Sequence, residues 1–188
     1  MKKYKCVLGV LKTEEGLRIK DEMLEWLTPD YDVAIAEQEA PGVLFEYPFV
    51  KKACEVSMLY DEPVLYLHTK GAANPNPLQA VVRRLWQYAF IKEKEIYFNT
   101  VAIPKPVVST LIASFEQKIC WFNGFVMNSA AAKNISAVLK PTEKRFWFEH
   151  GMLIDAKVGI AARLICDKRE NVWPTLVNYI NAKKLSSG

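Results

Sequence analysis

The sequence predicts an α/β fold, a three-layer α/β/α sandwich around a mostly parallel sheet. Short apolar segments alternate with segments of helical periodicity about a dozen residues long, which is typical of strand–helix–strand units. The apolar segments are nearly continuous, as expected for strands with both faces covered by helices. The 188 residues are 51% hydrophobic, so we expect a single domain, residues 1–188, with a large core.

Four apolar segments are the predicted strands. Each is short enough for a buried strand and is bounded by polar or turn-forming residues. The predicted strands cover residues 4–11, 33–36, 64–69 and 119–127.

The predicted helices follow the strands. Thr13 is expected to cap the first helix, which a Thr-Pro-Asp turn at residues 28–30 ends. The clearest helix lies at residues 78–90, where apolar residues recur at i, i+3, i+4 and i+7 and Arg83 and Arg84 take the opposite face. Further helices are expected at residues 49–59, 130–139 and 143–162, with short ones from Val107 and around Trp173.

Composition and motifs exclude several classes of protein. The net charge of +4 is small and the lysines are scattered, so we expect no nucleic-acid partner. No apolar run approaches the roughly 18 residues of a membrane span, and we expect a cytoplasmic protein without a transmembrane segment. The four cysteines stand far apart and are expected to be reduced, and two histidines exclude a multi-histidine metal site. The phosphate-binding P-loop, the dinucleotide-binding fingerprint and the nucleophile elbow are absent from the sequence.

The carboxyl ends of the predicted strands are the first place to look for a site, because ligands of open α/β sheets bind there. Thr13 follows the first strand and Glu37 follows the second. The third strand ends in the sequence HTKG, residues 68–71. Its imidazole, hydroxyl, ammonium and glycine are groups suited to holding an anion.

Each residue of the HTKG segment has a candidate role. Lys70 supplies a positive charge, Thr69 a hydroxyl donor, and Gly71 allows the backbone to approach a phosphate closely. His68 can donate to a phosphate or bind a metal. The alternative is that His68 is a packed strand residue and Lys70 a solvated charge. The position at a strand end favours the anion site.

The Asp30-Tyr31-Asp32 segment has the Asp-x-Asp pattern that holds a divalent cation in many enzymes using nucleotide sugars. It lies between a predicted helix and the start of the second strand. We therefore expect Asp30 and Asp32 at the opposite edge of the sheet from His68, and reject them as a metal site.

A second candidate region is aromatic. Residues 121–125 read WFNGF, where Trp121 is suited to stacking on a sugar or base. Asn123 and Gly124 are unusual within a predicted strand, because Gly weakens a strand unless another group approaches it closely.

Residues 145–150 read RFWFEH and belong to the same candidate region. Here Glu149 and His150 form a candidate general base and its partner. The alternative is an aromatic core in which Glu149 pairs with Arg145.

Taken together, these segments resemble a group of bacterial glycosyltransferase-like proteins of capsule or lipopolysaccharide synthesis. The shared features are the HTKG strand end, a following helix with Arg83 and Arg84, the aromatic segment at 121–125, and the later Arg-x-x-x-Glu pattern of Arg145 and Glu149. The resemblance covers residues 64–151 and, more weakly, the first two strands. It implies a GT-A-like fold and a nucleotide-diphosphate sugar as a partner.

The resemblance also implies roles for the candidate residues. The phosphates of the donor would be held by residues 68–71 with Arg83 and Arg84, and the nucleoside by Thr13 and Glu37. A carbohydrate acceptor would be held by Trp121, Asn123 and Gly124, and deprotonated by Glu149 beside His150, with inversion at the sugar.

Two points stay open at this stage. No Asp-x-Asp stands at a suitable position for the divalent cation, Mn²⁺ or Mg²⁺, that such enzymes often use, so the cofactor is undetermined. The alternative function is a catalytically silent module of the same fold that binds a nucleotide or carbohydrate.

Overall fold

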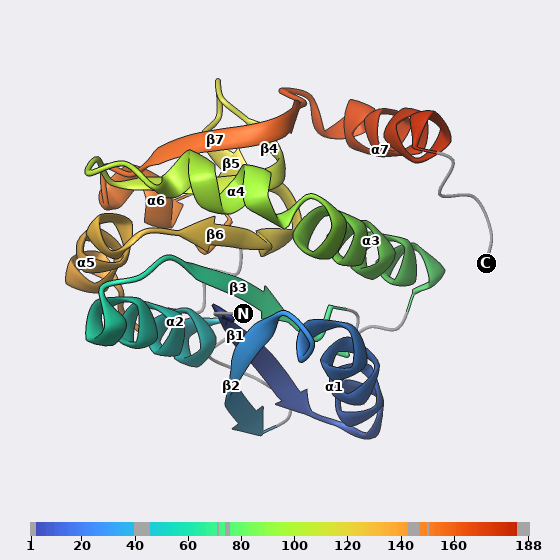
Figure 1. Ribbon diagram of the computed structural model, residues 1–188. Coiled ribbons are helices and arrows are strands. Elements are labelled where there is room, and N and C mark those ends of the chain that lie inside the picture. Colours follow the sequence, from blue (N-terminus) through green and yellow to red (C-terminus); the bar gives the residue numbers. More distant parts are fainter. Residues whose placement is uncertain are drawn as a thin grey trace.

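The computed structural model describes residues 3–39, 46–70, 72–73, 76–142, 147–149 and 151–183. In these parts of the chain, seven strands form one sheet in the order β2-β1-β3-β6-β4-β5, and β7 pairs with β4 (Figure 1). The strands are β1 Tyr4–Lys12, β2 Tyr31–Glu39, β3 Val64–His68, β4 Val107–Ser114, β5 Ile119–Cys120, β6 Phe125–Met127 and β7 Gly159–Ile165. The helices are α1 Glu14–Leu27, α2 Tyr47–Tyr60, α3 Pro77–Gln87, α4 Lys94–Val101, α5 Ser129–Val138, α6 Gly151–Asp155 and α7 Val172–Ala182.

The sheet is mixed, so the α/β class is confirmed but the mostly parallel arrangement is not. β1 runs parallel to β2 and β3, and β4 runs parallel to β7. β6 is antiparallel to both β3 and β4, and β5 is antiparallel to β4. The parallel alternation therefore holds for the first three strands and breaks in the second half of the chain.

Two wrong element predictions explain that break. Residues 107–114 form strand β4 rather than a helix, because this Val- and Ile-containing segment is buried along its whole length between neighbouring strands. The predicted helix at 143–162 is replaced by short helix α6 and strand β7. Lys157, with φ 53°, lies in the turn between them. Residues 143–146 lie outside the described residues.

The predicted strand at 119–127 is also interrupted. β5 and β6 are separated by a 3₁₀ turn, η2 (Trp121–Asn123), in which Phe122 and Asn123 have positive φ. The other first-half predictions are confirmed: Thr13 caps α1 by accepting from the Gly16 amide at 2.9 Å. The helix predicted at 78–90 is α3 followed by a π-helical turn, η1 (Tyr88–Lys92).

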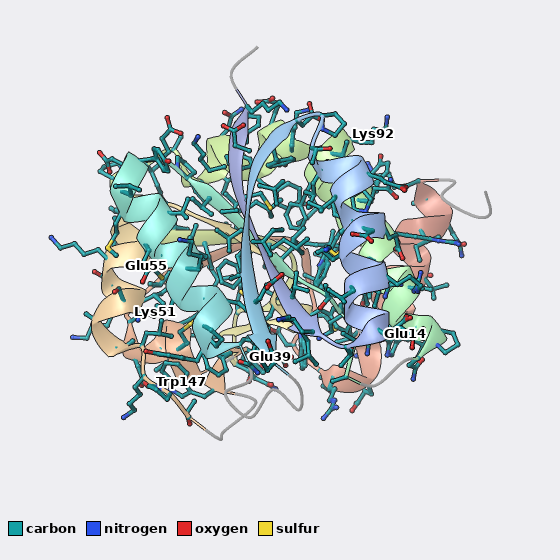
Figure 2. The ribbon with its side chains drawn as sticks, turned by 90° about the horizontal axis from the view of Figure 1, so that it is seen from below. Glu14, Glu39, Lys51, Glu55, Lys92 and Trp147 are labelled. Carbon is teal, nitrogen blue, oxygen red and sulfur yellow. The ribbon has the colours of Figure 1, made fainter. Side chains whose placement is uncertain are left out.

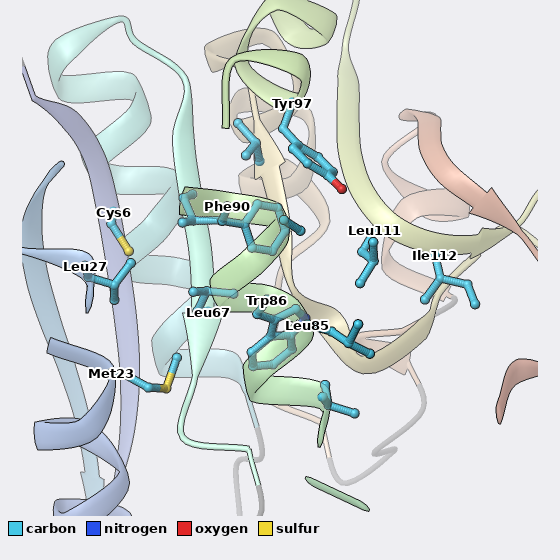
Figure 3. Packing of buried hydrophobic residues seen from close by; sticks show 14 of the residues in the cluster. Cys6, Met23, Leu27, Leu67, Leu85, Trp86, Phe90, Tyr97, Leu111 and Ile112 are labelled. Carbon is cyan, nitrogen blue, oxygen red and sulfur yellow. The ribbon is translucent and has the colours of Figure 1, made fainter. Parts of the chain in front are cut away.

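Helices cover both faces of the sheet. Helices α1, α3, α4 and α7 pack on one face and α2, α5 and α6 on the other (Figure 1). Alternate residues of β1 point to opposite faces of the sheet. Cys6 and Leu8 pack in the core on the α1 side, and Val7 packs in the core on the α2 side. Figure 3 shows Trp86 and Phe90 between Leu67 of β3 and the β4 residues on the first face.

Strand register fixes which polar residues share an edge of the sheet. Lys12 lies opposite Glu39 at the carboxyl ends of β1 and β2, whereas Lys5 lies opposite Asp32 at their amino ends. Figure 2 shows Glu39 and Trp147 at one end of the molecule and Lys92 at the other. The prediction that Asp30 and Asp32 lie away from His68 is confirmed.

Two further predictions concern the whole chain. All four cysteines are free and buried, as expected. None of the helices in the described segments is both long and apolar enough to cross a membrane.

Candidate functional site

A cavity of about 560 Å³ opens beyond the end of β3. Its walls come from the segment after β3, the start of α3, the turn between β4 and β5, η2, Glu149 and the beginning of α7. The lining residues are Lys70, Asn76, Leu78, Gln79, Gln117, Ile119, Trp121, Phe122, Glu149, Arg169, Val172 and Trp173. Three predicted site residues, Lys70, Trp121 and Glu149, thus meet in one cavity.

Lys70 is buried, with 9% of its surface exposed, rather than being the solvated charge of the alternative interpretation. Its ammonium lies 5.7 Å from the centre of the Phe122 ring, within range of a cation–π contact. Within the described segments this ammonium has no hydrogen bond or ion pair at contact distance. A buried cation facing a cavity without a direct anionic partner is suited to an anionic ligand.

Arg83 has a structural role in this site. It is buried, donates to the Lys70 carbonyl oxygen at 2.7 Å, and donates through Nε to Glu22 at 3.1 Å. It therefore joins α3, α1 and the segment after β3, and does not line the cavity. Arg84 is exposed on α3 and also lies outside the lining.

The two predicted hydroxyl groups hold neighbouring loops. Thr69 accepts from the Leu11 amide at 3.2 Å, which ties the segment after β3 to the end of β1. Thr13 donates to the Ala72 carbonyl oxygen at 3.4 Å in addition to capping α1. Neither residue lines the cavity, and nor does Glu37, which is exposed on β2. Gly71 lies outside the described residues.

Glu46 is a half-buried acidic residue that the sequence analysis did not select. Its carboxylate accepts hydrogen bonds from Asn123 Nδ2 at 2.5 Å and from the Tyr66 hydroxyl at 3.3 Å. His68 Nε2 lies 4.0 Å from its other oxygen. Glu46 immediately precedes α2, in the segment that follows β2, so the strand-end rule applied to that segment is the signal that could have found it.

Burial raises the pKa of Glu46 from its ordinary value of 4.5 to about 7. The positive charge of Lys70 opposes that rise, and the negative charge of Glu149 adds to it. The hydrogen bonds from Asn123 and Tyr66 favour the charged form. The charges of Lys70 and Glu149 therefore both act on the carboxyl group of Glu46, in opposite directions.

The backbone of η2 is strained where it meets Glu46. Phe122 has φ 68° and Asn123 φ 52°, a left-handed conformation that costs non-glycine residues roughly 1–3 kcal/mol each. The hydrogen bond to Glu46 and the contact of the Phe122 ring with Trp173, at 5.6 Å, stabilise this turn. It presents Phe122 to the cavity and keeps Asn123 buried, outside the lining.

Gly124 is explained by packing. A Cβ atom at this position would lie 2.5 Å from Nε1 of the buried Trp86 indole, so the close approach expected of this glycine is made by a tryptophan. Trp86 in turn contacts the His68 ring edge-on, with ring centres 5.6 Å apart. Gly124 thereby allows Trp86 to support the end of β3.

Hydrogen bonds to backbone carbonyl or amide groups hold the positions of Glu149 and Trp121 in the cavity lining. The Cys120 amide donates to the Glu149 carbonyl oxygen at 3.0 Å, and Trp121 Nε1 donates to the Cys166 carbonyl oxygen at 3.0 Å. Both side chains remain partly exposed to the cavity. His150 and Arg145 lie outside the described residues.

Arg169 and Trp173 also line the cavity, although the sequence analysis assigned them no role. They come from the segment before α7 and from α7 itself, which follow β7 in the chain and line the same cavity as Lys70 after β3. Their residue types, a cation and an aromatic ring, match the chemistry of Lys70 and Trp121. No local sequence pattern distinguishes them from ordinary residues of a short helix.

The described residues do not offer a site for a divalent cation. They contain no group of three His, Cys, Asp or Glu side chains placed to hold a metal ion. Asp32 is paired with Lys5 and Asp30 with Lys94, both at 2.9 Å, at the other edge of the sheet.

Comparison with family models and with curated proteins does not assign the chain to a family. No protein-family model matches the chain. A search of curated proteins finds no match either.

Proposed function

We propose that the protein is a glycosyltransferase of GT-A-like fold that moves a sugar from a nucleotide-diphosphate donor to a hydroxyl acceptor. The observation that carries the proposal is the meeting of Lys70, three aromatic side chains and Glu149 in one cavity at the carboxyl end of β3. Such a cavity offers a cation for phosphates, flat apolar surfaces for sugar rings, and a carboxylate for a hydroxyl proton. Helices on both faces of the sheet and a site at its carboxyl edge are consistent with a GT-A-like fold.

Lys70 is the proposed partner of the donor's diphosphate. Its ammonium faces the cavity from a buried position, where a charge–charge contact is weakly screened. As the bond from the anomeric carbon to the diphosphate breaks, the electron pair leaves with the diphosphate. A fixed cation beside that oxygen stabilises the charge that develops. Arg169, exposed at the rim of the same cavity, is placed to share this role.

Glu149 is the proposed general base. It takes the proton of the acceptor hydroxyl while the acceptor oxygen forms the new bond to the anomeric carbon. Attack on the face opposite the leaving diphosphate inverts the configuration at that carbon. Trp121 and Trp173 give the cavity aromatic surfaces on which an acceptor sugar can stack, and Gln79 provides a hydrogen-bonding amide.

The test is a thermal-shift screen against nucleotide-diphosphate sugars with and without Mn²⁺, followed by an assay of sugar transfer with the ligands that bind. A ligand that binds the native state raises the melting temperature by mass action. Lys70→Ala should lower affinity for the best ligand by roughly ten- to a hundredfold, the worth of a charge-assisted contact. Lys133→Ala, which removes an exposed lysine from α5, is the matched control and should leave affinity unchanged.

Three outcomes separate the possibilities. Binding with transfer supports the enzyme, and binding without transfer to any hydroxyl acceptor supports the silent binding module. If no nucleotide-diphosphate sugar binds, or if Lys70→Ala binds as tightly as the parent, the proposed function is wrong.

A further inference from the structure

Asp167 lies where two segments that line the cavity come together. The turn between β4 and β5 contributes Gln117 to the lining, and the segment between β7 and α7 contributes Arg169. β7 lies beside β4 in the sheet and runs parallel to it, so its end reaches the end of β4, where this turn begins (Figure 1). Asp167, two residues after β7, forms hydrogen bonds across this junction.

The carboxylate of Asp167 fixes the backbone of the turn. Its Oδ1 atom accepts from the Ser114 hydroxyl at 2.9 Å. The same atom accepts from the amides of Phe115 and Glu116 at 3.1 and 3.3 Å. Ser114, the last residue of β4, is fully buried. Because a carboxylate is a stronger acceptor than a neutral group, three donors to one of its oxygens hold the turn in a single conformation.

Gln117 is held by the same network. Its backbone amide donates to Ser114 Oγ at 3.0 Å, and its side-chain Nε2 donates to the Asp167 carbonyl oxygen at 2.9 Å. Since that carbonyl oxygen requires a donor, Nε2 must lie toward Asp167, and Oε1 is the acceptor that remains on the Gln117 amide. Within the described residues no group donates to this oxygen, and Gln117 lines the cavity.

We propose that Gln117 is a specificity-determining residue whose Oε1 accepts a hydrogen bond from a hydroxyl of the donor sugar, and that Asp167 is the positioning residue that holds it. The inference rests on the proposed function, because it assigns the ligand of the cavity to a nucleotide-diphosphate sugar. Asp167 acts through Ser114 and Gln117 and does not line the cavity.

The chemistry of the ligand favours the sugar as the partner of Oε1. The diphosphate offers acceptor oxygens, so it is not a partner for another acceptor. A sugar hydroxyl is a donor, and the donor sugar is bonded directly to the diphosphate. With the diphosphate at Lys70, the sugar therefore enters the cavity that Gln117 also lines. The ribose and the base carry donors too, but both are present in a nucleoside diphosphate, so an experiment can separate them from the sugar.

The experiment measures binding of a sugar nucleotide and of its nucleoside diphosphate by calorimetric titration. The pair is the one that the thermal-shift screen selects, for example UDP-glucose and UDP. Gln117→Met keeps the length of the side chain and removes the amide. It should weaken binding of the sugar nucleotide by about three- to tenfold, the value of one hydrogen bond between neutral groups, and leave the nucleoside diphosphate unchanged. Gln87→Met replaces an exposed glutamine of α3 outside the lining and, as the matched control, should change neither.

A second set of variants tests Asp167 through the ratio of sugar-nucleotide affinity to nucleoside-diphosphate affinity. Asp167→Ala releases the turn and should lower this ratio as Gln117→Met does. In the double variant the two losses should not add, because Asp167 acts through Gln117. Asp167→Asn keeps an oxygen that can accept from Ser114 and should restore most of the ratio. Ser57→Ala removes a buried hydroxyl that donates to the Glu62 carbonyl oxygen at 2.7 Å, so it should lower the melting temperature without changing the ratio.

Each outcome decides a different claim. If Gln117→Met weakens both ligands equally, or neither, the inference is overturned, while loss of binding in Lys70→Ala would still support the proposed function. If the losses of Asp167→Ala and Gln117→Met add in the double variant, Asp167 does not act through Gln117 and its positioning role is overturned. If no nucleotide-diphosphate sugar binds, the proposed function fails and this inference with it.

Discussion

The guanidinium of Arg83 donates a hydrogen bond of 2.7 Å to the carbonyl oxygen of Lys70. The same guanidinium bonds Glu22 of α1 through Nε, at 3.1 Å, and Nη2, at 3.3 Å. A cation predicted to bind phosphate is thus used inside the protein, where it fixes the backbone of the residue that faces the cavity. Its neighbour Arg84, exposed on the same helix, makes no such contact in the described part of the chain.

Arg83→Ala should destabilise the protein, and Arg84→Ala should not. The first removes buried hydrogen bonds from a charged donor, worth about 2–3 kcal/mol together with the packing of the side chain. For a chain of this size that corresponds to a fall in melting temperature of roughly 4–12 °C. Arg84→Ala should stay within about 0.5 kcal/mol of the parent. Equal melting temperatures for the two variants would contradict the structural role of Arg83.

Gly124→Ala should destabilise the protein because the new methyl group meets the Trp86 indole at 2.5–2.9 Å. Trp86 is fully buried, so it has little room to move, and overpacking of this kind costs roughly 1–3 kcal/mol. Gly159→Ala is the matched control, since its nearest neighbour would be a carbonyl oxygen at 3.4 Å, an ordinary contact. Chemical denaturation of both variants measures the difference, and a neutral Gly124→Ala would show that Trp86 can shift.

The first half of the fold follows from local sequence. The Thr13 cap and the continuous apolar runs of β1 and β3 each depend on neighbours within a few residues, and both were predicted. Strand direction alone then placed Asp32 and His68 at opposite edges. These are the features for which propensity and periodicity are sufficient.

The second half depends on tertiary structure. The segment at 107–114 is a strand because β6 and β7 lie on either side of it, a fact that its own residues do not contain. Likewise, Glu46 becomes a site residue only because η2 brings Asn123 against it. Lys70 was predicted from its position, but its burial beneath Phe122 was not, because the aromatic turn is far away in the sequence.

Lys70→Met should lose diphosphate binding without losing stability. The buried ammonium has no ion-pair partner at contact distance in the described segments, so the cation–π contact with Phe122 offsets only part of its desolvation. Methionine has a similar length and no charge, and we expect a melting temperature in the absence of ligand equal to or above that of the parent. A large fall in melting temperature would show that Lys70 is needed for folding rather than for a ligand.

Glu46 should make the stability of the parent fall as pH rises from about 4.5 to 7. Its carboxyl has an ordinary pKa of 4.5 and a pKa of about 7 in the folded protein, so the folded state binds more protons within this window. Above pH 7 the raised pKa of Glu46 lowers the free energy of unfolding by at most roughly 3 kcal/mol. Solvent screening of the partly exposed side chain reduces this value. Glu46→Gln should therefore be more stable than the parent at pH 8, by denaturant titration, and about equal to it at pH 4.5. A difference that does not depend on pH would contradict the raised pKa of Glu46.

Glu149→Gln separates a general base from a structural residue. Glutamine keeps the shape of the side chain and most of its hydrogen-bonding capacity, but it cannot take a proton from an acceptor hydroxyl. Because the base acts in the chemical step, turnover should fall by roughly 10²–10⁴-fold, while affinity for the donor changes little. The Cys120 amide bonds the backbone oxygen of Glu149, not its side chain, so that contact survives the substitution and the melting temperature should hold.

The same variant also tests the alternative pairing of Glu149 with Arg145. If that pairing is what Glu149 provides, Glu149→Gln should lower the melting temperature and leave turnover per folded molecule close to that of the parent. Loss of the Glu149 charge should in addition lower the pKa of Glu46, since that charge now raises it, and so shift the pH dependence of stability toward lower pH. If the pH dependence shifts in this way and turnover is unchanged, Glu149 contributes only a negative charge at the cavity and is not the general base.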